Sequence, residues 1–560
     1  MTDFNHNKYQ ASPVVSMQHR QWPDKQLSQA PQWCSVDLRD GNQALIDPMT
    51  PIQKHRLFDQ LISIGIKEIE VGFPAASQTD YDFIREIIEQ DKVPEGVTLQ
   101  VLTPARPELI DRSFEALKGA KKAIVHLYNS TSKVQREHVF QLDKAGIIEI
   151  AITGAKRLQE QASLYPDTDW TFQYSPESFT HTELDFAVEI CNAVTGVWQP
   201  TSDKPTIINL PATVETAMPN VYADQIEWFC QHVNNREALI ISLHTHNDRG
   251  CAVAAAEMGV LAGADRVEGT LLGNGERTGN MDIITMAMNL YSQGINPQLD
   301  LSDMDSIIAT VKACTNLPVH PRHPYAGELV FTAFSGSHQD AINKCLKQQK
   351  ADKAWNVAYL PIDPADLGRN YQEVIRINSQ SGKGGIAYVI EQQLGIQLPR
   401  WMQIDFSAIV QAETERQARE LSQSAIAELF QQQYLSQSQG YTLSSYQLNR
   451  SDNTEHLQAC FNDLDSEICI NTEAEGGIAA MVKAISTLSQ QTITIIEYDE
   501  HSLKNTDNGN NADALCFIQC NIDGNRFCGV GQSNDVFSAS SAALLSAVNQ
   551  QIKQQKQGVA

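Results

Sequence analysis

Two histidines spaced two residues apart are the side chains in this sequence best suited to metal chemistry. His244 and His246 follow an apolar, β-prone run at residues 239–244. On a strand, residues i and i+2 point to the same face, whereas on a helix they diverge by about 200°. A same-face imidazole pair at the end of a buried strand suits one divalent metal ion. The spacing alone leaves a second interpretation open, in which both histidines only satisfy hydrogen bonds.

Asp40 can complete such a site. One carboxylate and two imidazoles form a facial ligand set that leaves positions open for substrate and water, and Asn280 can add a neutral oxygen. The neighbouring Arg39 is positively charged and suits a carboxylate or oxyanion ligand. Taken singly, Asp40 has the ordinary alternative of a loop or helix-cap aspartate, and Arg39 that of a surface salt bridge.

A repeating alternation of strand-like and helical segments is expected to position these residues. Segments of helical periodicity, such as 52–64, 82–90 and 183–194, separate eight apolar runs. This rhythm predicts an α/β fold of the (β/α)8 TIM-barrel type. An open doubly wound sheet is the alternative, and the absence of GxGxxG after the first run weakens it. The eight runs are 33–38, 68–72, 97–102, 123–127, 170–174, 206–210, 239–244 and 266–269.

A barrel would gather polar side chains at one rim, because reactive groups of such barrels lie at the carboxyl ends of the strands. The glycine-rich loop after the last run suits close backbone approach to a ligand, although plain turns use the same residues. Glu177 and Thr213 could instead cap the helices that follow them. The groups expected at this rim are Asp40, His126, Ser175, Glu177, Thr213, His244 and His246, with Gly273, Asn274, Gly275 and Glu276 of the loop.

The remaining sequence predicts further domains. We expect an N-terminal arm at 1–30, the barrel at 31–300, helical linker subdomains at 301–435 and a C-terminal α+β domain at 440–560. A single helix is expected over 411–432, followed by a linker at 431–440 that is rich in glutamine and serine. The last domain reads as a duplicated β-β-β-α unit, which favours a regulatory or dimerising role. Its expected strands are 441–448, 456–461, 467–471, 492–498, 514–520 and 526–529, and its expected helices are 477–488 and 538–553.

Bulk composition excludes several classes of function. A formal charge of −25 argues against non-specific binding to nucleic acid or to anionic membranes. No apolar run approaches the roughly 18 residues needed to span a bilayer, and no signal peptide is visible. The 11 cysteines include no CxxC pair, so we expect reduced thiols without a disulfide framework in a cytoplasmic protein.

Several blocks resemble one enzyme family. LRDGNQ at 38–43, HTHND at 244–248 and GNGERTGN at 273–280 are similar to the signature motifs of the isopropylmalate and homocitrate synthase family, which is related to the hydroxymethylglutaryl-CoA lyases. Four further blocks resemble the long-form isopropylmalate synthases of that family. These are EVGFP at 70–74, FSGSHQDAI at 334–342, LPIDP at 360–364 and NSQSGKGG at 378–385. The resemblance is dense over about residues 30–400 and extends to the C-terminal domain by layout only.

The resemblance implies an acyltransferase of leucine biosynthesis. It would condense acetyl-CoA with 3-methyl-2-oxobutanoate and water to give 2-isopropylmalate and CoA. A divalent ion is implied, with Mg2+ expected first and Mn2+, Zn2+ or Co2+ admitted, and with K+ as a further activator to test. The alternatives are a citramalate or homocitrate synthase that uses another 2-oxo acid, a lyase, and a catalytically silent amino-acid sensor.

The resemblance also implies roles for individual residues. The metal ligands would be Asp40, His244 and His246, with Asn280 in or beside that shell. Contacts to the oxo acid would fall on Arg39, His126, Ser175 and Thr213, and Arg39 would also stabilise the enolate. Acid and base work would fall on Glu177 and His338, and Tyr359 would couple catalysis to regulation.

Two implications concern assembly and regulation. His338 lies outside the barrel, in a segment that reaches the partner's active site in this family, so we expect a homodimer with shared sites. The C-terminal duplication corresponds to the family's leucine-binding feedback domain, with Gly476 and Gly477 at its first helix. Here the chain departs from the usual Gly-Asn-Gly-Pro turn, because it has Ala474, Glu475, Gly476 and Gly477. The carboxylate of Glu475 could disturb binding of the leucine carboxylate.

Overall fold

The protein forms two compact units. The computed structural model describes residues 6–369, 383–417, 421–436, 440–463, 466–502 and 513–557. One unit comprises Met1–Val330 with Ile362–Arg369, and the other comprises Phe331–Pro361 with Asn370–Ala560. We describe each unit by itself.

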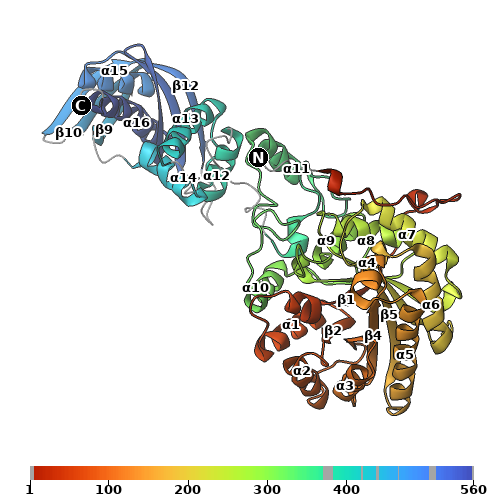
Figure 1. The fold of residues 1–560 in the computed structure, drawn as a ribbon. Coiled ribbons are helices and arrows are strands. Elements are labelled where there is room, and N and C mark those ends of the chain that lie inside the picture. Colours follow the sequence, from red (N-terminus) through yellow and green to blue (C-terminus); the bar gives the residue numbers. More distant parts are fainter. Residues whose placement is uncertain are drawn as a thin grey trace, which may run out of the picture. The chain divides into compact units, whose positions relative to one another are not determined.

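The first unit is a closed barrel of eight parallel strands, which confirms the predicted TIM-barrel fold (Figure 1). Each strand pairs with the next in sequence, and β1 closes the ring against β8 with Cys34 opposite Glu268. The strands are β1 (Gln32–Ser35), β2 (Glu68–Gly72), β3 (Thr98–Pro104), β4 (Lys122–Ser130), β5 (Asp169–Glu177), β6 (Thr206–Ala212), β7 (Leu239–Thr245) and β8 (Arg266–Gly269).

Helices surround the strands (Figure 1), and several of them begin at a side-chain cap. Thr50 caps α1 in a reciprocal capping box with Gln53, and Asp143 and Asp282 cap α5 and α9. The helices of this unit are α1 (Pro51–Ser63), α2 (Gln78–Glu89), α3 (Pro107–Leu117), α4 (Lys133–Gln135), α5 (Lys144–Ser163), α6 (Leu184–Trp198), α7 (Pro219–His232), α8 (Ala252–Leu261), α9 (Ile283–Ser292) and α10 (Met304–Thr315).

The first apolar run ends earlier than its sequence suggests. The strand expected at 33–38 stops at Ser35, and the chain then makes a π-helical turn, η3 (Asp37–Gly41). Such single turns are rare and are frequent at functional sites. Upstream, the expected arm is anchored to α7, where Arg20 and the Trp22 indole both bind the buried Asp224.

The second unit begins with helices. These are α11 (Gly336–Gln348), α12 (Lys383–Leu394), α13 (Arg400–Gln417) and α14 (Gln423–Phe430), and the last is followed by a π-helical turn, η10 (Gln431–Leu435). The single helix expected over 411–432 is therefore wrong. Two helices occupy this region, and α14 starts afresh with the Ser422 hydroxyl accepting from the Ala425 N–H. A serine at this position competes with helix continuation by capping a new start.

The C-terminal part of the second unit confirms the predicted duplication. Each half is a three-stranded antiparallel sheet followed by one helix, and both helices pack into one apolar core. The first half comprises β9 (Thr442–Ser451), β10 (Thr454–Asp463), β11 (Ser466–Ala474) and α15 (Gly477–Ser489). The second half comprises β12 (Ile493–Ser502), β13 (Ala514–Ile522), β14 (Asn525–Ser533) and α16 (Val536–Gln557). Throughout the described residues, the helices are all too short or too polar to cross a bilayer.

One cysteine pair contradicts the expectation of reduced thiols only. Cys460 on β10 and Cys469 on β11 form a disulfide and are directly opposed in the ladder. Pairing of the two strands brings the thiols together, and this register is not visible from cysteine spacing alone. The nine other cysteines are free.

An ion pair at the start of α6 makes the fold sensitive to acid. Arg136 binds both carboxylate oxygens of Glu183, at 2.7 and 2.9 Å. These hydrogen bonds lower the pKa of Glu183 to about 2. Because this folded-state pKa lies below the value of 4.5 for a free carboxyl group, the stabilisation is present above pH about 4.5 and is lost as the pH falls toward 2.

We therefore expect Glu183→Gln to lower the free energy of unfolding by about 0.5–1 kcal/mol at pH 7. The difference in the free energy of unfolding between the variant and the unmodified protein should shrink as the pH falls from 5 to 3. Scanning calorimetry of the barrel transition at several pH values measures this, with Glu189→Gln, at an exposed site on the same helix, as the control. A constant difference across this pH range would contradict the assignment.

Candidate active site

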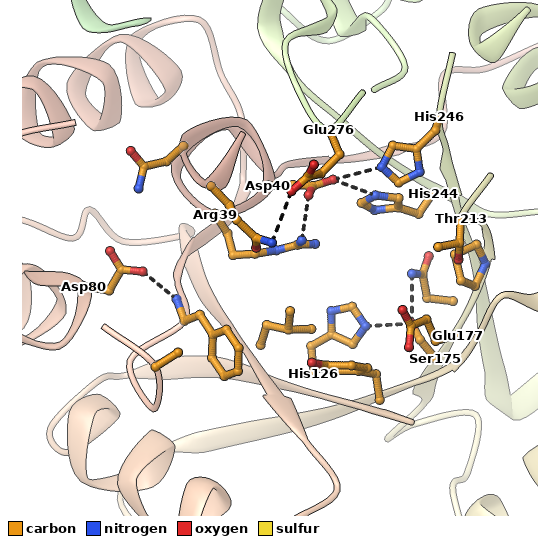
Figure 2. Close-up of a pocket in the computed structure, with 18 of the residues that line it drawn as sticks. Arg39, Asp40, Asp80, His126, Ser175, Glu177, Thr213, His244, His246 and Glu276 are labelled. Atoms are coloured by element: carbon orange, nitrogen blue, oxygen red, sulfur yellow. Dashed lines mark hydrogen bonds and ion pairs between the residues drawn. The ribbon is translucent and has the colours of Figure 1, made fainter. Parts of the chain in front are cut away.

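Four side chains from three distant segments converge at the carboxyl-terminal rim of the barrel, and Figure 2 shows three of them, Asp40, His244 and His246. Asp40 lies on η3, His244 and His246 lie at the end of β7, and Asn280 follows the loop after β8. Ligand atoms of Asp40 and the two histidines lie within 4.8 Å of one another. Oδ2 of Asp40 is 3.1 Å from Nε2 of His244 and 3.3 Å from Nε2 of His246. All four residues are buried.

This donor set fits a divalent cation. A buried carboxylate, two imidazole nitrogens and an amide oxygen are ligands that such cations accept. Asn280 now points Nδ2 at Asp40, and its Oδ1 is buried without a hydrogen-bond partner among the described residues. Rotating the amide by 180° would turn this oxygen toward the same ligands and leave no orphaned acceptor.

The cavity beside the ligand set has a volume of about 660 Å3. Arg39 lies at its wall, with Nη1 3.0 Å from Oδ1 of Asp40 and with Nε paired to the buried Glu70. Burial acts to lower the pKa of Arg39, but the charges of Glu70 and Asp40 outweigh burial and raise it. The guanidinium is thus a fixed positive charge beside the expected metal position.

The residues expected to contact an oxo acid line the same cavity as the metal ligands, with Arg39 beside Asp40 and with Thr213 near His244 (Figure 2). Nε2 of His126 is 2.7 Å from Oγ of Ser175, and Nδ1 of His126 is 2.9 Å from Glu70. Thr213 follows β6 and accepts a hydrogen bond from the Ser178 N–H. The structure therefore brings His126, Ser175 and Thr213 to one cavity with Arg39, as the barrel prediction required.

Glu177, the expected acid or base, lines the same cavity at the end of β5. The Ser130 hydroxyl at the end of β4 donates a short hydrogen bond to its carboxylate. This contact fixes the orientation of the Glu177 carboxylate.

The glycine-rich loop packs tightly against the metal ligands. A Cβ on Gly275 would collide with Oδ1 of Asn280, and a Cβ on Gly279, where φ is +102°, would collide with the Gly273 carbonyl. Asn274 donates to the Gly41 carbonyl, 2.8 Å away, and thereby joins the loop to η3. Glycine is therefore required here for close approach within the protein itself.

Arg277 holds this loop in place. Its guanidinium binds both carboxylate oxygens of Asp248 and donates to the Thr213 carbonyl at 2.6 Å. Arg277 has a φ of +54°, which is uncommon for a residue with a side chain. The clamp brings the loop, with Glu276 at the cavity wall, against the segments that follow β6 and β7.

Sequence reasoning missed the polar layer beneath the cavity. It consists of fully buried side chains from β2, β3 and β8, namely Glu70, Gln100, Arg266 and Glu268. One signal could have found them, because a charged residue inside a buried strand must be paired. Arg266 and Glu268 both lie in a four-residue strand and are 2.8 Å apart.

His338 and Tyr359 belong to the second unit, and the structure brings these two together. His338 lies on α11, and its ring stacks on Tyr359 with centroids 3.9 Å apart. Tyr359 is 60% exposed and has a φ of +64°. Of the block at 378–385, residues 378–382 lie outside the described residues.

The expected regulatory glycines lie where α15 begins. Gly476 is the N-cap residue of α15, and Glu475 before it is exposed. A Cβ on Gly477 would approach Phe537 of α16 and Leu448 of β9 to 3.0 and 3.1 Å. Gly477 therefore permits close packing of the two halves of the duplication.

Comparison with known proteins gives matches along almost the whole chain. Residues 30–311 match the HMGL-like family, residues 328–391 match the alpha-isopropylmalate synthase, post-catalytic domain-like family, and residues 420–552 match the LeuA allosteric (dimerisation) domain. A 2-isopropylmalate synthase of Pseudomonas entomophila (strain L48) is 52% identical over 98% of both chains.

The chain belongs to the 2-isopropylmalate synthase family. A second relative, from Pseudomonas syringae pv. tomato (strain ATCC BAA-871 / DC3000), bears the same name and is 51% identical over 98% of this chain and 97% of its own. A solved hydroxymethylglutaryl-CoA lyase from Pseudomonas aeruginosa covers 52% of this chain and 95% of its own, with 18% identity and a TM-score of 0.43. Dependence on a divalent metal is a property of the HMGL-like family, and the donor set of Asp40, His244 and His246 is consistent with it.

The packing of the glycine loop predicts a specific loss of metal binding. Gly275→Ala should displace Asn280 and weaken binding of Mn2+ to the metal-free protein by about tenfold or more, by analogy with the loss of a supporting contact at a metal site. Titration followed by electron paramagnetic resonance measures this. Gly196→Ala on α6, where a Cβ would meet nothing within 4 Å, is the control. Equal affinities for the two variants would contradict the packing argument.

Proposed function

We propose that this protein is a 2-isopropylmalate synthase that condenses acetyl-CoA with 3-methyl-2-oxobutanoate and water to give (2S)-2-isopropylmalate and CoA. One observation carries the proposal. The buried set of Asp40, His244, His246 and Asn280 lies beside the fixed charge of Arg39 at one cavity, in a chain 52% identical to a protein of that name. Burial and convergence of these groups favour an enzyme over a catalytically silent sensor.

The cavity residues suit a short branched 2-oxo acid. A divalent cation held by Asp40, His244, His246 and Asn280 would supply Lewis-acid polarisation of the 2-oxo group. Arg39 would hold negative charge on the substrate beside it. The Ser175 and Thr213 hydroxyls would orient the acid, and the apolar wall of Leu102 and Pro211 would take its isopropyl group.

A base must remove a proton from the acetyl methyl group. We assign this step to Glu177, because it lines the cavity and the Ser130 hydroxyl fixes its carboxylate. The carbanion equivalent then attacks the ketone carbon, and Arg39 stabilises the resulting oxyanion. Hydrolysis of the thioester releases CoA and makes the reaction irreversible. His338, stacked on Tyr359, is our second acid-base group, supplied by the partner subunit.

We assign the C-terminal duplication to feedback inhibition by leucine and to dimerisation, supported by its match to the LeuA allosteric (dimerisation) domain. Gly476 and Gly477 would shape the leucine site at the start of α15. We take Mg2+ as the working cation, with Mn2+, Zn2+ and Co2+ as replacements and K+ as an activator to be tested. The cytoplasm is our proposed location.

Release of free thiol from acetyl-CoA tests the reaction and its substrate. With Mg2+ present, release should be fastest with 3-methyl-2-oxobutanoate, slower with pyruvate or 2-oxoglutarate, and lower when leucine is added. His244→Ala should abolish release, whereas His232→Ala, at an exposed imidazole on α7, should not. Faster release with pyruvate or 2-oxoglutarate would identify a citramalate or homocitrate synthase instead, and no release with any acid would sink the proposal.

The role of Glu177 has its own test. Glu177→Gln should lower kcat by about 100-fold or more, in the range expected for loss of a general base, with little change in the KM for the oxo acid. It should also suppress exchange of acetyl-CoA methyl protons with deuterated water. Glu183→Gln, six residues away and outside the cavity lining, should keep near-normal kcat. An unchanged rate of proton exchange in Glu177→Gln would show that another group is the base.

A further inference from the structure

Glu268 occupies an unusual position beneath the metal ligands. It is the third residue of β8, is fully buried and does not line the cavity. Its Oε2 is 2.8 Å from Nδ1 of His244. The other contacts of its carboxylate come from hydrogen-bond donors on four strands, namely Arg266 at 2.8 Å, Gln173 at 2.8 Å, Gln100 at 3.2 Å and Asn209 at 3.4 Å.

We propose that Glu268 is a positioning residue that sets the tautomer and ring orientation of His244 for metal binding. A carboxylate surrounded by donors can only accept hydrogen bonds, so Nδ1 of His244 must carry its proton. In neutral imidazole the lone pair then lies on Nε2, and Nε2 is the nitrogen that faces Asp40 at 3.1 Å. The inference rests on the proposed metal-dependent function and adds a residue that never touches metal or substrate.

His246, the second histidine, has a backbone group instead of a carboxylate as the partner of its Nδ1. Nδ1 of His246 is 3.3 Å from the backbone carbonyl of Ala212, at the end of β6. A backbone acceptor fixes the same tautomer but carries no net charge. The two imidazoles are therefore supported by different groups, and only the support of His244 can be removed by substituting a side chain.

A purely structural role for Glu268 would be to neutralise the buried Arg266. Arg266 has a second carboxylate partner, because Oε2 of Glu68 is 2.5 Å from its Nε. Glu68 lies on β2, is partly exposed and makes no hydrogen bond with His244 among the described residues. The two carboxylates thus share the task of pairing Arg266, whereas Glu268 alone contacts the histidine. This difference provides a matched pair of variants.

Replacement by glutamine separates these two roles. In Glu268→Gln the side chain keeps its size, but when its amide oxygen stays with the donors of Arg266, Gln100 and Gln173, its NH2 group takes the place of Oε2 and faces Nδ1 of His244. The one remaining oxygen cannot accept from all of them and also from Nδ1 of His244. His244 would lose its fixed tautomer. Glu68→Gln removes a comparable charge from Arg266 and leaves the His244 contact intact.

The test measures Mn2+ binding to metal-free, full-length protein without substrates, by calorimetry and electron paramagnetic resonance. We expect the Kd to rise by about 10–100-fold in Glu268→Gln, the range for loss of a group that supports a metal ligand. We expect a change of less than about threefold in Glu68→Gln. At saturating Mn2+, Glu268→Gln should recover much of its kcat, because the reacting groups of the cavity are unchanged.

Two results would overturn the proposal. One is an unchanged Kd in Glu268→Gln, and the other is an equal loss in Glu68→Gln, which would assign the effect to the pairing of Arg266. If Glu268→Gln fails to fold, Glu268→Asp decides, because it keeps the charge but withdraws it from His244, and its Kd should rise at least about fivefold. An unchanged Kd in that variant would equally reject the proposal. Metal binding is measured without turnover, so failure of this inference and failure of the synthase assignment are distinguishable.

Discussion

Ionic groups buried inside the barrel are the constraint on which the rest of the site depends. Glu70, Arg266 and Glu268 lie where barrels of this type usually hold branched apolar side chains, and Arg39 on η3 pairs with Glu70 from the cavity wall. Removing such charges from water costs several kcal/mol each, so each must be paired and hydrogen-bonded. Burial acts to raise the pKa of Glu70, but Arg39 and His126 lower it to about 2, and the carboxylate stays ionised. The layer thus forms a fixed set of paired charges below the cavity.

This layer of buried charged side chains orients the reactive groups above it. Glu70 binds Arg39 and His126, and Glu268 binds His244, so these three cavity-lining side chains are each held by a buried carboxylate. Such support keeps donor atoms in place before a ligand arrives, which is how electrostatic preorganisation acts. As a consequence, the barrel interior tolerates little substitution, because removal of either member of a buried ion pair leaves the other charge unpaired.

Backbone geometry also determines where the metal-binding side chains lie. The π-helical turn η3 places Asp40 beside the histidines, and the glycines of the loop after β8 let Asn280 approach the same point. Arg277 then clamps that loop to Asp248 and to the Thr213 carbonyl. Side chains supply the donors, but close backbone contacts set the distances between them.

The order of strands and helices, the duplicated C-terminal domain and the same-face pair His244 and His246 were predictable from the sequence. Hydrophobic periodicity records which face of each element is buried, and strand ends of a barrel meet at one rim. The break between α13 and α14 was not predicted, because a serine cap overrode good helix formers. The disulfide of Cys460 and Cys469 was missed for a similar reason, since strand register sets it.

The sequence by itself determined the chemistry that was available, namely a carboxylate, two imidazoles, a guanidinium and an amide at strand ends. Only the tertiary structure decided which of these groups meet. Asp40 and His244 are 204 residues apart and come within 3.1 Å because the barrel closes β1 against β8, next to β7. The same closure places Glu268 behind His244. Periodicity specifies a buried face, but the contacts within that face depend on how the strands pair and stagger around the ring.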